Sequence, residues 1–280
     1  MNNIAYISNV TERMVYGTDK DWAMNINRFD WVPGTGLYGI YSAYQYTNKK
    51  EYLDFLIAWT EKNKNGALKL KTVNSTAPFL TIIELYRITK NEEYKKICIE
   101  AAEYILNKAP RTVSGGLEHT VTEDVEGFRE QIWADTLFMV CLFMVRIGKI
   151  LNNDSYLEFA AEQLKIHHKF LKNKENGLFF HGYDCANKIH LSAVCWGRAN
   201  AWIIYSTNLI LNELPEFDGK NEVISSMEEQ IKALAKYQHD DGGFSTVIDD
   251  AQTYEETSAA AGIAAGVYMA VKAGYVSDKY

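Results

Sequence analysis

A carboxylic acid between apolar runs is the first side chain in this sequence that could do acid/base chemistry. Asp135 stands in Gln131-Ile-Trp-Ala-Asp-Thr-Leu-Phe-Met139, near the expected start of a helix. Such an aspartate is often only a helix cap. It could instead lie beside Trp133 with its proton affinity raised by apolar surroundings, as a general acid requires. The spacing alone leaves both interpretations open.

Two histidines stand at matching positions of two glycine loops. His119 ends Gly115-Gly-Leu-Glu-His119, and His181 ends Asn176-Gly-Leu-Phe-Phe-His181. A single loop histidine is usually just solvated. Because these two are equivalent, they are candidates for contact with a substrate or for proton transfer.

A cationic segment, Trp196-Gly-Arg-Ala-Asn-Ala-Trp202, could recognise a carboxylate. Arg198 and Trp202 stand four residues apart, so they would share one face of a helix. A guanidinium flanked by Trp196 and Trp202 could hold a carboxylate while the indole rings hold a sugar. The alternative is a cation–π pair that only closes the core.

Two alternating signatures predict the elements that position these residues. In the first, a helix ends in a polar turn and the next opens on a tyrosine, as in Tyr46-Thr-Asn-Lys-Lys-Glu-Tyr52, Ile88-Thr-Lys-Asn-Glu-Glu-Tyr94 and Leu151-Asn-Asn-Asp-Ser-Tyr156. In the second, a helix ends in a glycine turn, as at Gly66, Gly115, Gly177 and Gly242. Strict alternation of this kind is typical of stacked helical hairpins.

We expect an all-α fold and a single domain over residues 1–280, an (α/α)6 toroid of helical hairpins. Inner helices, apolar on most of their circumference, are predicted at 33–47, 76–89, 131–149, 194–212 and 254–273. Outer helices are predicted at 2–15, 52–64, 94–107, 156–172 and 221–237.

Residues at the starts of the inner helices should converge at one mouth of such a ring. They would form a funnel with apolar walls and a few fixed polar groups, which suits a small polar substrate. These residues are Trp31, Asn74, Thr76, His119, Trp133, Asp135, His181, Trp196, Arg198, Asn200, Trp202, Tyr254 and Glu255.

Charge and composition exclude several classes of protein. The formal net charge is −7 and no basic patch is evident, which disfavours nucleic acid and anionic membranes as partners. The start of the chain has no secretory signal pattern, and no apolar run reaches the length of a membrane span. The cysteines at 98, 141, 185 and 195 have no disulfide or metal spacing, so we expect a cytoplasmic protein without a metal site or cofactor. His167 and His168 lie within an expected helix and are interpreted as structural.

Four segments give the sequence a family resemblance. In order, they are Ile132-Trp-Ala-Asp-Thr-Leu-Phe-Met139, Gly177-Leu-Phe-Phe-His-Gly-Tyr183, the segment 196–202, and Tyr254-Glu-Glu-Thr-Ser-Ala259. Together they resemble the unsaturated rhamnogalacturonyl hydrolases of glycoside hydrolase family 105, relatives of the unsaturated glucuronyl hydrolases of family 88. The resemblance runs through nearly the whole chain. It implies an α/α barrel that removes an unsaturated uronic acid from the non-reducing end of lyase-generated, pectin-type oligosaccharides by hydrating its C4=C5 bond.

The resemblance also implies roles for single residues. Asp135 falls on the catalytic acid/base, and the substrate positions are His119, His181, Trp196, Arg198 and Trp202. Many members carry a second aspartate where this chain offers Asn74 or Thr76, which puts the role of a second carboxylate in doubt. Ala199 and Ala201 stand where glycine is common in the family.

Two other functions compete with this interpretation. The absence of the second aspartate favours a non-catalytic sugar-binding toroid. A different α/α-barrel enzyme, such as a sugar 2-epimerase, could use His119 and His181 as its acid/base pair. The elements Trp133-Ala-Asp-Thr136 and Tyr254-Glu-Glu-Thr-Ser258 disfavour the epimerase.

The end of the chain carries a further expectation. The predicted helices number ten, whereas six hairpins need twelve. We therefore expect the ring to lack its last hairpin. The helix around Ala260–Ala270 would then leave an apolar seam facing the helix near Leu37–Tyr44, and self-association or marginal stability would follow.

Overall fold

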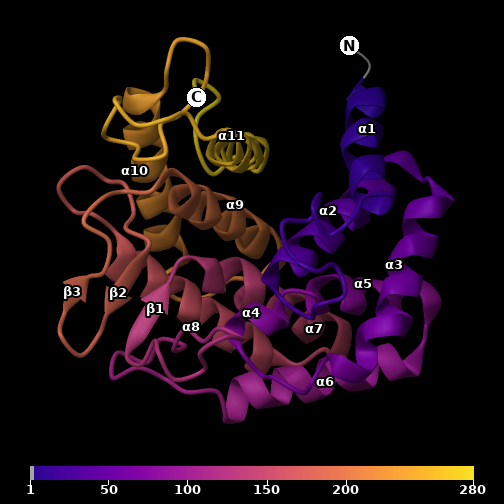
Figure 1. Cartoon of the computed structure of the whole chain (residues 1–280). Coiled ribbons are helices and arrows are strands. Elements are labelled where there is room, and N and C mark those ends of the chain that lie inside the picture. Colours follow the sequence, from indigo (N-terminus) through magenta and orange to yellow (C-terminus); the bar gives the residue numbers. More distant parts are fainter. Residues whose placement is uncertain (1–2) are drawn as a thin grey trace. The chain divides into compact units, whose positions relative to one another are not determined.

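The computed structural model describes residues 3–280, which form two compact units. The first unit comprises the chain up to Lys108 together with Thr120–Val125. The second comprises Ala109–His119 and Glu126–Tyr280. Both are built mainly from helices, as predicted (Figure 1). That the two units make one domain stays a prediction.

The first unit consists of helical hairpins. Its elements are α1 (Asn3–Val15), α2 (Trp31–Thr47), α3 (Lys50–Asn63), the 3-10 turn η1 (Lys64–Gly66), α4 (Val73–Thr76), α5 (Phe79–Thr89) and α6 (Glu92–Asn107). Helix α2 packs against α1, α3 and α5, and α5 packs against α6. Outer and inner helices alternate here in the predicted way.

The second unit adds a small sheet to its helices. Its elements are β1 (Gln131–Trp133), the π-helical segment η2 (Leu137–Cys141), α7 (Leu142–Leu151), α8 (Asp154–Leu171), β2 (Gly182–Asp184), β3 (Ile189–His190), α9 (Gly197–Glu213), α10 (Lys220–Tyr237) and α11 (Thr257–Lys272). The strands are antiparallel in the order β1-β2-β3, and β1 and β2 pack against α8 (Figure 1).

The polar turns between helices match the first sequence signature. Each preceding helix ends on a residue with left-handed backbone geometry, namely Asn48, Lys90 and Asn152. The tyrosines that follow, Tyr52, Tyr94 and Tyr156, are at most 1% exposed and are among the largest buried side chains. Each turn therefore reverses the chain and anchors the next helix in the core with an aromatic ring.

The predicted helix over 131–149 is wrong at its start. Gln131–Trp133 is a strand, with Trp133 opposite Gly182 of β2. The helix begins at Asp135 and Thr136, passes through the π-helical segment η2, and continues as α7 from Leu142, whose N–H bonds to the carbonyl of Leu137 five residues back. A continuous apolar run does not distinguish a buried strand from a buried helix, and the pairing partner lies far along the chain.

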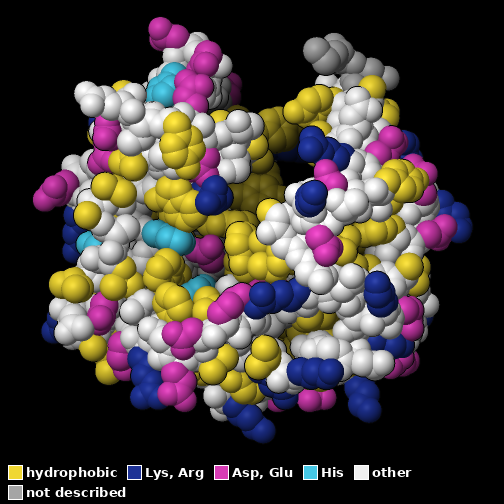
Figure 2. Space-filling view, in the orientation of Figure 1, with side chains coloured by type: hydrophobic (Ala, Val, Ile, Leu, Met, Phe, Trp, Pro, Cys, Tyr) yellow, Lys and Arg dark blue, Asp and Glu magenta, His cyan; other side chains and the backbone are white. Residues whose placement is uncertain are grey.

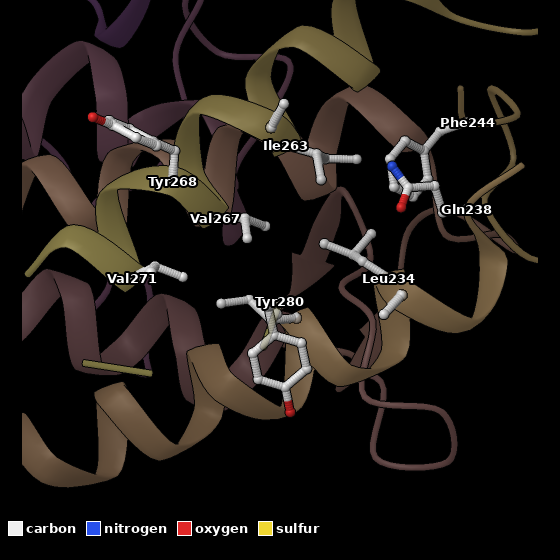
Figure 3. Close-up of a pocket in the computed structure, with 11 residues that line it drawn as sticks. Leu234, Gln238, Phe244, Ile263, Val267, Tyr268, Val271 and Tyr280 are labelled. Atoms are coloured by element: carbon white, nitrogen blue, oxygen red, sulfur yellow. The ribbon is translucent and has the colours of Figure 1, made fainter. Parts of the chain in front are cut away.

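Helix α11 packs closely on one neighbour and loosely on another. Against α9 the approach is tight, because a Cβ at Gly266 would lie 2.8 Å from a methyl carbon of Ile204. Between α10 and α11 lies an apolar pocket of about 320 Å³, lined by Leu234, Val267 and Tyr280 among others (Figure 3). None of the helices within residues 3–280 has the length and apolar character needed to cross a membrane.

Candidate active site

Strand β1 places both loop histidines beside Asp135. On one edge of β1, the backbone N–H of His119 donates to the carbonyl of Gln131 at 2.8 Å. At its end, the N–H of Ala134 donates to the carbonyl of His181 at 2.9 Å. Residues 119 and 181 thus flank Trp133 and Asp135, although they come from distant loops. Figure 2 shows histidine and acidic side chains next to hydrophobic ones over β1 and β2.

Asp135 and His181 form a close pair. Oδ2 of Asp135 lies 2.6 Å from Nε2 of His181, and the two side chains are 16% and 18% exposed. Burial raises the pKa of Asp135, but the hydrogen bond and charge of His181, with help from His119, outweigh it and hold the pKa below the ordinary value. The predicted rise in this pKa is therefore wrong. The reason is a partner 46 residues away, whose contact with Asp135 the local pattern does not reveal.

His119 is a neutral, buried imidazole stacked on Trp133. It is 6% exposed, and burial lowers its pKa to about 4. The ring centroids of His119 and Trp133 lie 5.3 Å apart at an interplanar angle of 26°. Its Nδ1 is buried and has no hydrogen-bond partner among residues 3–280. Such an atom can accept or donate a hydrogen bond when a polar ligand arrives.

A row of rings connects this group to Arg198. The ring of Trp133 meets His181 edge-on at 4.5 Å, and His181 meets Trp196 in the same manner at 4.7 Å. The guanidinium carbon of Arg198 lies 4.2 Å from the centre of a Trp196 ring. The order His119, Trp133, His181, Trp196 and Arg198 defines what we call the aromatic row. Most of the predicted site residues in the second unit belong to it.

Glu256 holds Arg198 in place. It was not among the predicted site residues. This carboxylate is 6% exposed and forms an ion pair with Arg198. It also accepts hydrogen bonds from the indole N–H of Trp196 at 3.1 Å and from the hydroxyl of Thr246 at 2.8 Å. Glu256 lies in the segment 254–259 that carries the family resemblance, so a signal was present. The motif alone did not tell which of its two glutamates is buried.

Backbone bonds between two loops bring Glu256 to the start of α9. The N–H of Gly197 donates to the carbonyl of Thr246 at 2.7 Å. The N–H of Glu256 donates to the carbonyl of Phe244 at 2.9 Å. Because both bonds involve the strand-like segment 244–247, the segment sets the distance between Arg198 and its carboxylate.

Asn200 is a support for the site and not a part of the aromatic row. It is fully buried one turn into α9. Its side chain accepts from the N–H of Phe179 and donates to the carbonyl of the same residue, both at 2.9 Å. This amide therefore holds the loop that presents His181.

The ring of Trp202 contacts Phe138, at 5.0 Å between centroids. Its predicted place beside Arg198 stays a prediction. Tyr254 is 70% exposed, and Glu255 pairs with His239. A different residue, Phe128, meets both His119 and Trp133 edge-on.

The predicted site residues Trp31, Asn74 and Thr76 belong to the first unit. Asn74 and Thr76 are buried in α4. The Thr76 hydroxyl donates to the carbonyl of Thr72 at 2.8 Å. Their part in substrate binding stays a prediction.

One group of metal-type side chains occurs among residues 3–280. His239, Asp241 and Glu255 have ligand atoms within 4.8 Å of one another. The two nitrogens of His239 already contact Glu255 and Ser245, at 2.8 and 3.0 Å, and both acids are exposed. We assign no metal to this group.

The chain as a whole belongs to a known class of enzyme. The chain is a member of glycosyl hydrolase family 88, whose model matches residues 6–280. Among its relatives is the unsaturated rhamnogalacturonyl hydrolase YesR of Bacillus subtilis (strain 168). That protein is 33% identical over 276 residues, which are 98% of this chain and 78% of YesR.

Solved structures share the fold. A protein of Klebsiella pneumoniae described as a possible member of the GH105 family superimposes with a TM-score of 0.91, at 33% identity, over 99% of this chain and 76% of the other. A similarly described protein of Salmonella enterica gives 0.90 at 33% identity, over 97% and 76%. The predicted resemblance and the α/α-toroid fold class are thereby confirmed.

Proposed function

We propose that this protein is an unsaturated uronyl hydrolase. It removes a uronic acid with a C4=C5 double bond from the non-reducing end of lyase-generated oligosaccharides. Membership of glycosyl hydrolase family 88 and the name of its relative YesR support this activity. The single observation that carries the proposal is the 2.6 Å contact between Asp135 and His181, a member of the aromatic row.

The chemistry begins with one proton held by the pair. In the active form, one extra proton is shared between the carboxylate of Asp135 and the neutral imidazole of His181. Asp135 delivers this proton to C4 of the substrate, and positive charge develops across C5 and the ring oxygen. A water then adds to C5, and the Asp135 carboxylate takes its proton, which restores the pair.

The product of hydration breaks down without further help from acid groups. The new hydroxyl at C5 makes a hemiketal, which collapses as the ring opens and releases the aglycone sugar. Ordinary glycoside hydrolysis needs two carboxyl groups at the anomeric carbon. Here one carboxyl serves first as acid and then as base, so Thr76 in place of a second aspartate is compatible with turnover.

The remaining residues of the row would hold the uronate. Arg198 has a guanidinium suited to the planar carboxylate, and Glu256 keeps it in place. The rings of Trp133 and Trp196 offer apolar walls for the sugar. The unpartnered Nδ1 of His119 would bond to a hydroxyl of the substrate. We retain Trp202, Asn74 and Thr76 as proposed substrate residues.

Finer features of the function are also proposed. We expect the substrate to be a rhamnogalacturonan disaccharide from pectin, in line with the name of YesR. A cytoplasmic location is supported by the four cysteines, which are buried free thiols. Self-association through the apolar face of α11 stays a prediction.

A direct assay tests the proposal. Lyase-generated disaccharides absorb ultraviolet light through the C4=C5 bond, and hydration removes that absorbance. We expect loss of absorbance with the wild-type protein and none with Asp135→Asn. Binding without loss of absorbance would identify a sugar-binding protein instead, and activity on saturated sugars alone would identify an epimerase.

A further inference from the structure

Lysines gather beside the sheet of a chain whose net charge is −7. Lys169, Lys172 and Lys174, at and after the end of α8, and Lys188, between β2 and β3, line one groove of about 490 Å³. We call it the lysine groove. The expectation that no basic patch exists is therefore wrong. The patch forms because the β2–β3 hairpin brings Lys188 to a segment that is rich in lysine.

Most of these lysines are open to an anion. Lys172 forms an ion pair with Glu229. Within residues 3–280, Lys169, Lys174 and Lys188 have no carboxylate within 4.0 Å, and all three are exposed. Glu175 is the acid that lines the groove. The local charge is thus positive, opposite in sign to the charge of the whole chain.

Aromatic rings form one wall of the lysine groove. Phe170 stacks on Tyr183 at 5.3 Å between centroids, and Phe180 stacks on His190 at 4.0 Å. Tyr183 and His190 meet at 5.2 Å, which joins the two stacks. Nε2 of His190 donates to the carbonyl of Phe170 at 3.1 Å and so fixes the ring. The groove therefore combines an apolar wall of stacked rings with lysine ammonium groups.

We propose that the lysine groove is a second saccharide-binding site that takes an acidic oligosaccharide, a run of uronate residues. The C–H face of a sugar ring can lie on the aromatic wall, while the ammonium groups pair with carboxylates that recur along the chain. The choice of a uronate rests on the proposed function.

The lysine groove and the active site use one extended segment. Phe180 points into the groove, and the next residue, His181, contacts Asp135. Successive side chains of an extended segment point to opposite faces. A uronate chain bound in the groove would therefore be held close to the site that cleaves its unsaturated end, without occupying that site.

Calorimetric titration with a saturated oligogalacturonate tests the proposal. This ligand has no C4=C5 bond, so it is not a substrate. The groove variant is Lys169→Gln with Lys174→Gln and Lys188→Gln. Its matched control is Lys96→Gln with Lys149→Gln and Lys236→Gln, three exposed lysines without a recorded ion pair on α6, α7 and α10. Both variants change the net charge equally.

We expect the groove variant to bind about tenfold more weakly than the wild type and the control variant to lose less than about twofold. Added salt should weaken binding, and a neutral glucan should not bind. Equal losses in both variants would overturn the proposal. So would equal binding of polyglutamate or single-stranded DNA, since the site would then not select a saccharide.

The proposed function and the lysine-groove proposal can be disproved independently of each other. The groove variant should hydrolyse the unsaturated disaccharide at the wild-type rate, because none of its lysines belongs to the aromatic row. If the wild type does not hydrolyse the disaccharide but binds the oligogalacturonate through the groove lysines, the proposed function is wrong and the groove stands. If hydrolysis occurs and the groove variant binds as well as the wild type, the groove proposal is wrong.

Discussion

Two carboxylates in the second unit are both shielded from solvent, but their partners differ. Asp135 meets His181, an imidazole whose ring nitrogen can either donate or accept a hydrogen bond. Glu256 meets Arg198, whose guanidinium has only donor groups, and it accepts further hydrogen bonds from Trp196 and Thr246. The first pair can therefore exchange a proton with a substrate. The second can only hold a fixed charge in a fixed place.

The largest effect should come from the proton-exchanging carboxylate. Asp135→Asn keeps the shape and the contact with His181 but cannot deliver a proton. Turnover should fall about 10²–10⁴-fold, the usual contribution of a general acid/base, while the disaccharide still binds. Absorbance at the C4=C5 band measures the rate, and calorimetry measures binding. A variant with more than about a tenth of the wild-type rate would contradict the assigned role.

Acid should destabilise the fold through three buried histidines, His119, His167 and His168. The folded pKa values of His119 and His167 are lowered to about 4, and that of His168 to about 3, all by burial. The unfolded chain takes up these protons near pH 6.5, and the folded chain does not. Stability is therefore fully present above about pH 6.5 and is lost as the pH falls toward 4, by up to about 3 kcal/mol for each histidine.

His119→Phe isolates the share of one imidazole in this response. The urea midpoint of the variant should fall less steeply than that of the wild type between pH 6.5 and 4, because His167 and His168 remain. The ring stack on Trp133 is kept. Parallel pH profiles for the two proteins would show that folding does not lower the pKa of His119.

The fixed-charge pair should act on binding more than on rate. Arg198→Ala removes the guanidinium proposed to hold the uronate, and KM should rise about tenfold while kcat changes little. The expected loss of binding free energy is at the low end for a charged hydrogen bond, because the Arg198 side chain is 40% exposed. Glu256→Gln leaves the guanidinium of Arg198 in the protein, so it should raise KM less than Arg198→Ala does. An unchanged KM in Arg198→Ala would make the arginine structural.

The smallest effect is expected at Trp202. The ring of Trp202 packs on Phe138, and phenylalanine can keep that contact, so Trp202→Phe should change KM by less than about threefold. Trp196→Phe is the matched control, because it removes the indole N–H that bonds to Glu256. If Trp202→Phe has the larger effect on KM, the original pairing of two tryptophans around Arg198 is correct.

Local sequence signals predicted the helices well, because tyrosine turns and glycine turns are short-range features. The exceptions have physical causes. The predicted helix 76–89 begins only at Phe79 as α5, after Pro78, and the short helix α4 (Val73–Thr76) that precedes it was not predicted. Strand β1 depends on pairing with β2, fifty residues further along the chain, and its apolar composition fits a helix equally well.

The sequence predicted which residues form the site better than it predicted the pKa of Asp135. Asp135, His119 and His181 come together because two equivalent loops meet one strand. The direction of the pKa shift of Asp135 was missed, since it depends on His181 and not on neighbouring residues. Glu256 was missed because a Glu-Glu pair before a helix usually faces solvent.

The π-helical segment Leu137–Cys141 carries one residue more per turn than an α-helix would. In a regular helix, the face that α7 buries would also fix the direction in which Asp135 points. The extra residue allows the two to be set independently. Deleting one residue between 137 and 141 would restore α-helical spacing and rotate Asp135 by about 100° relative to α7, while the core of the helix stayed intact. A single-codon insertion or deletion is thus enough to move this carboxylate into or out of line with His181.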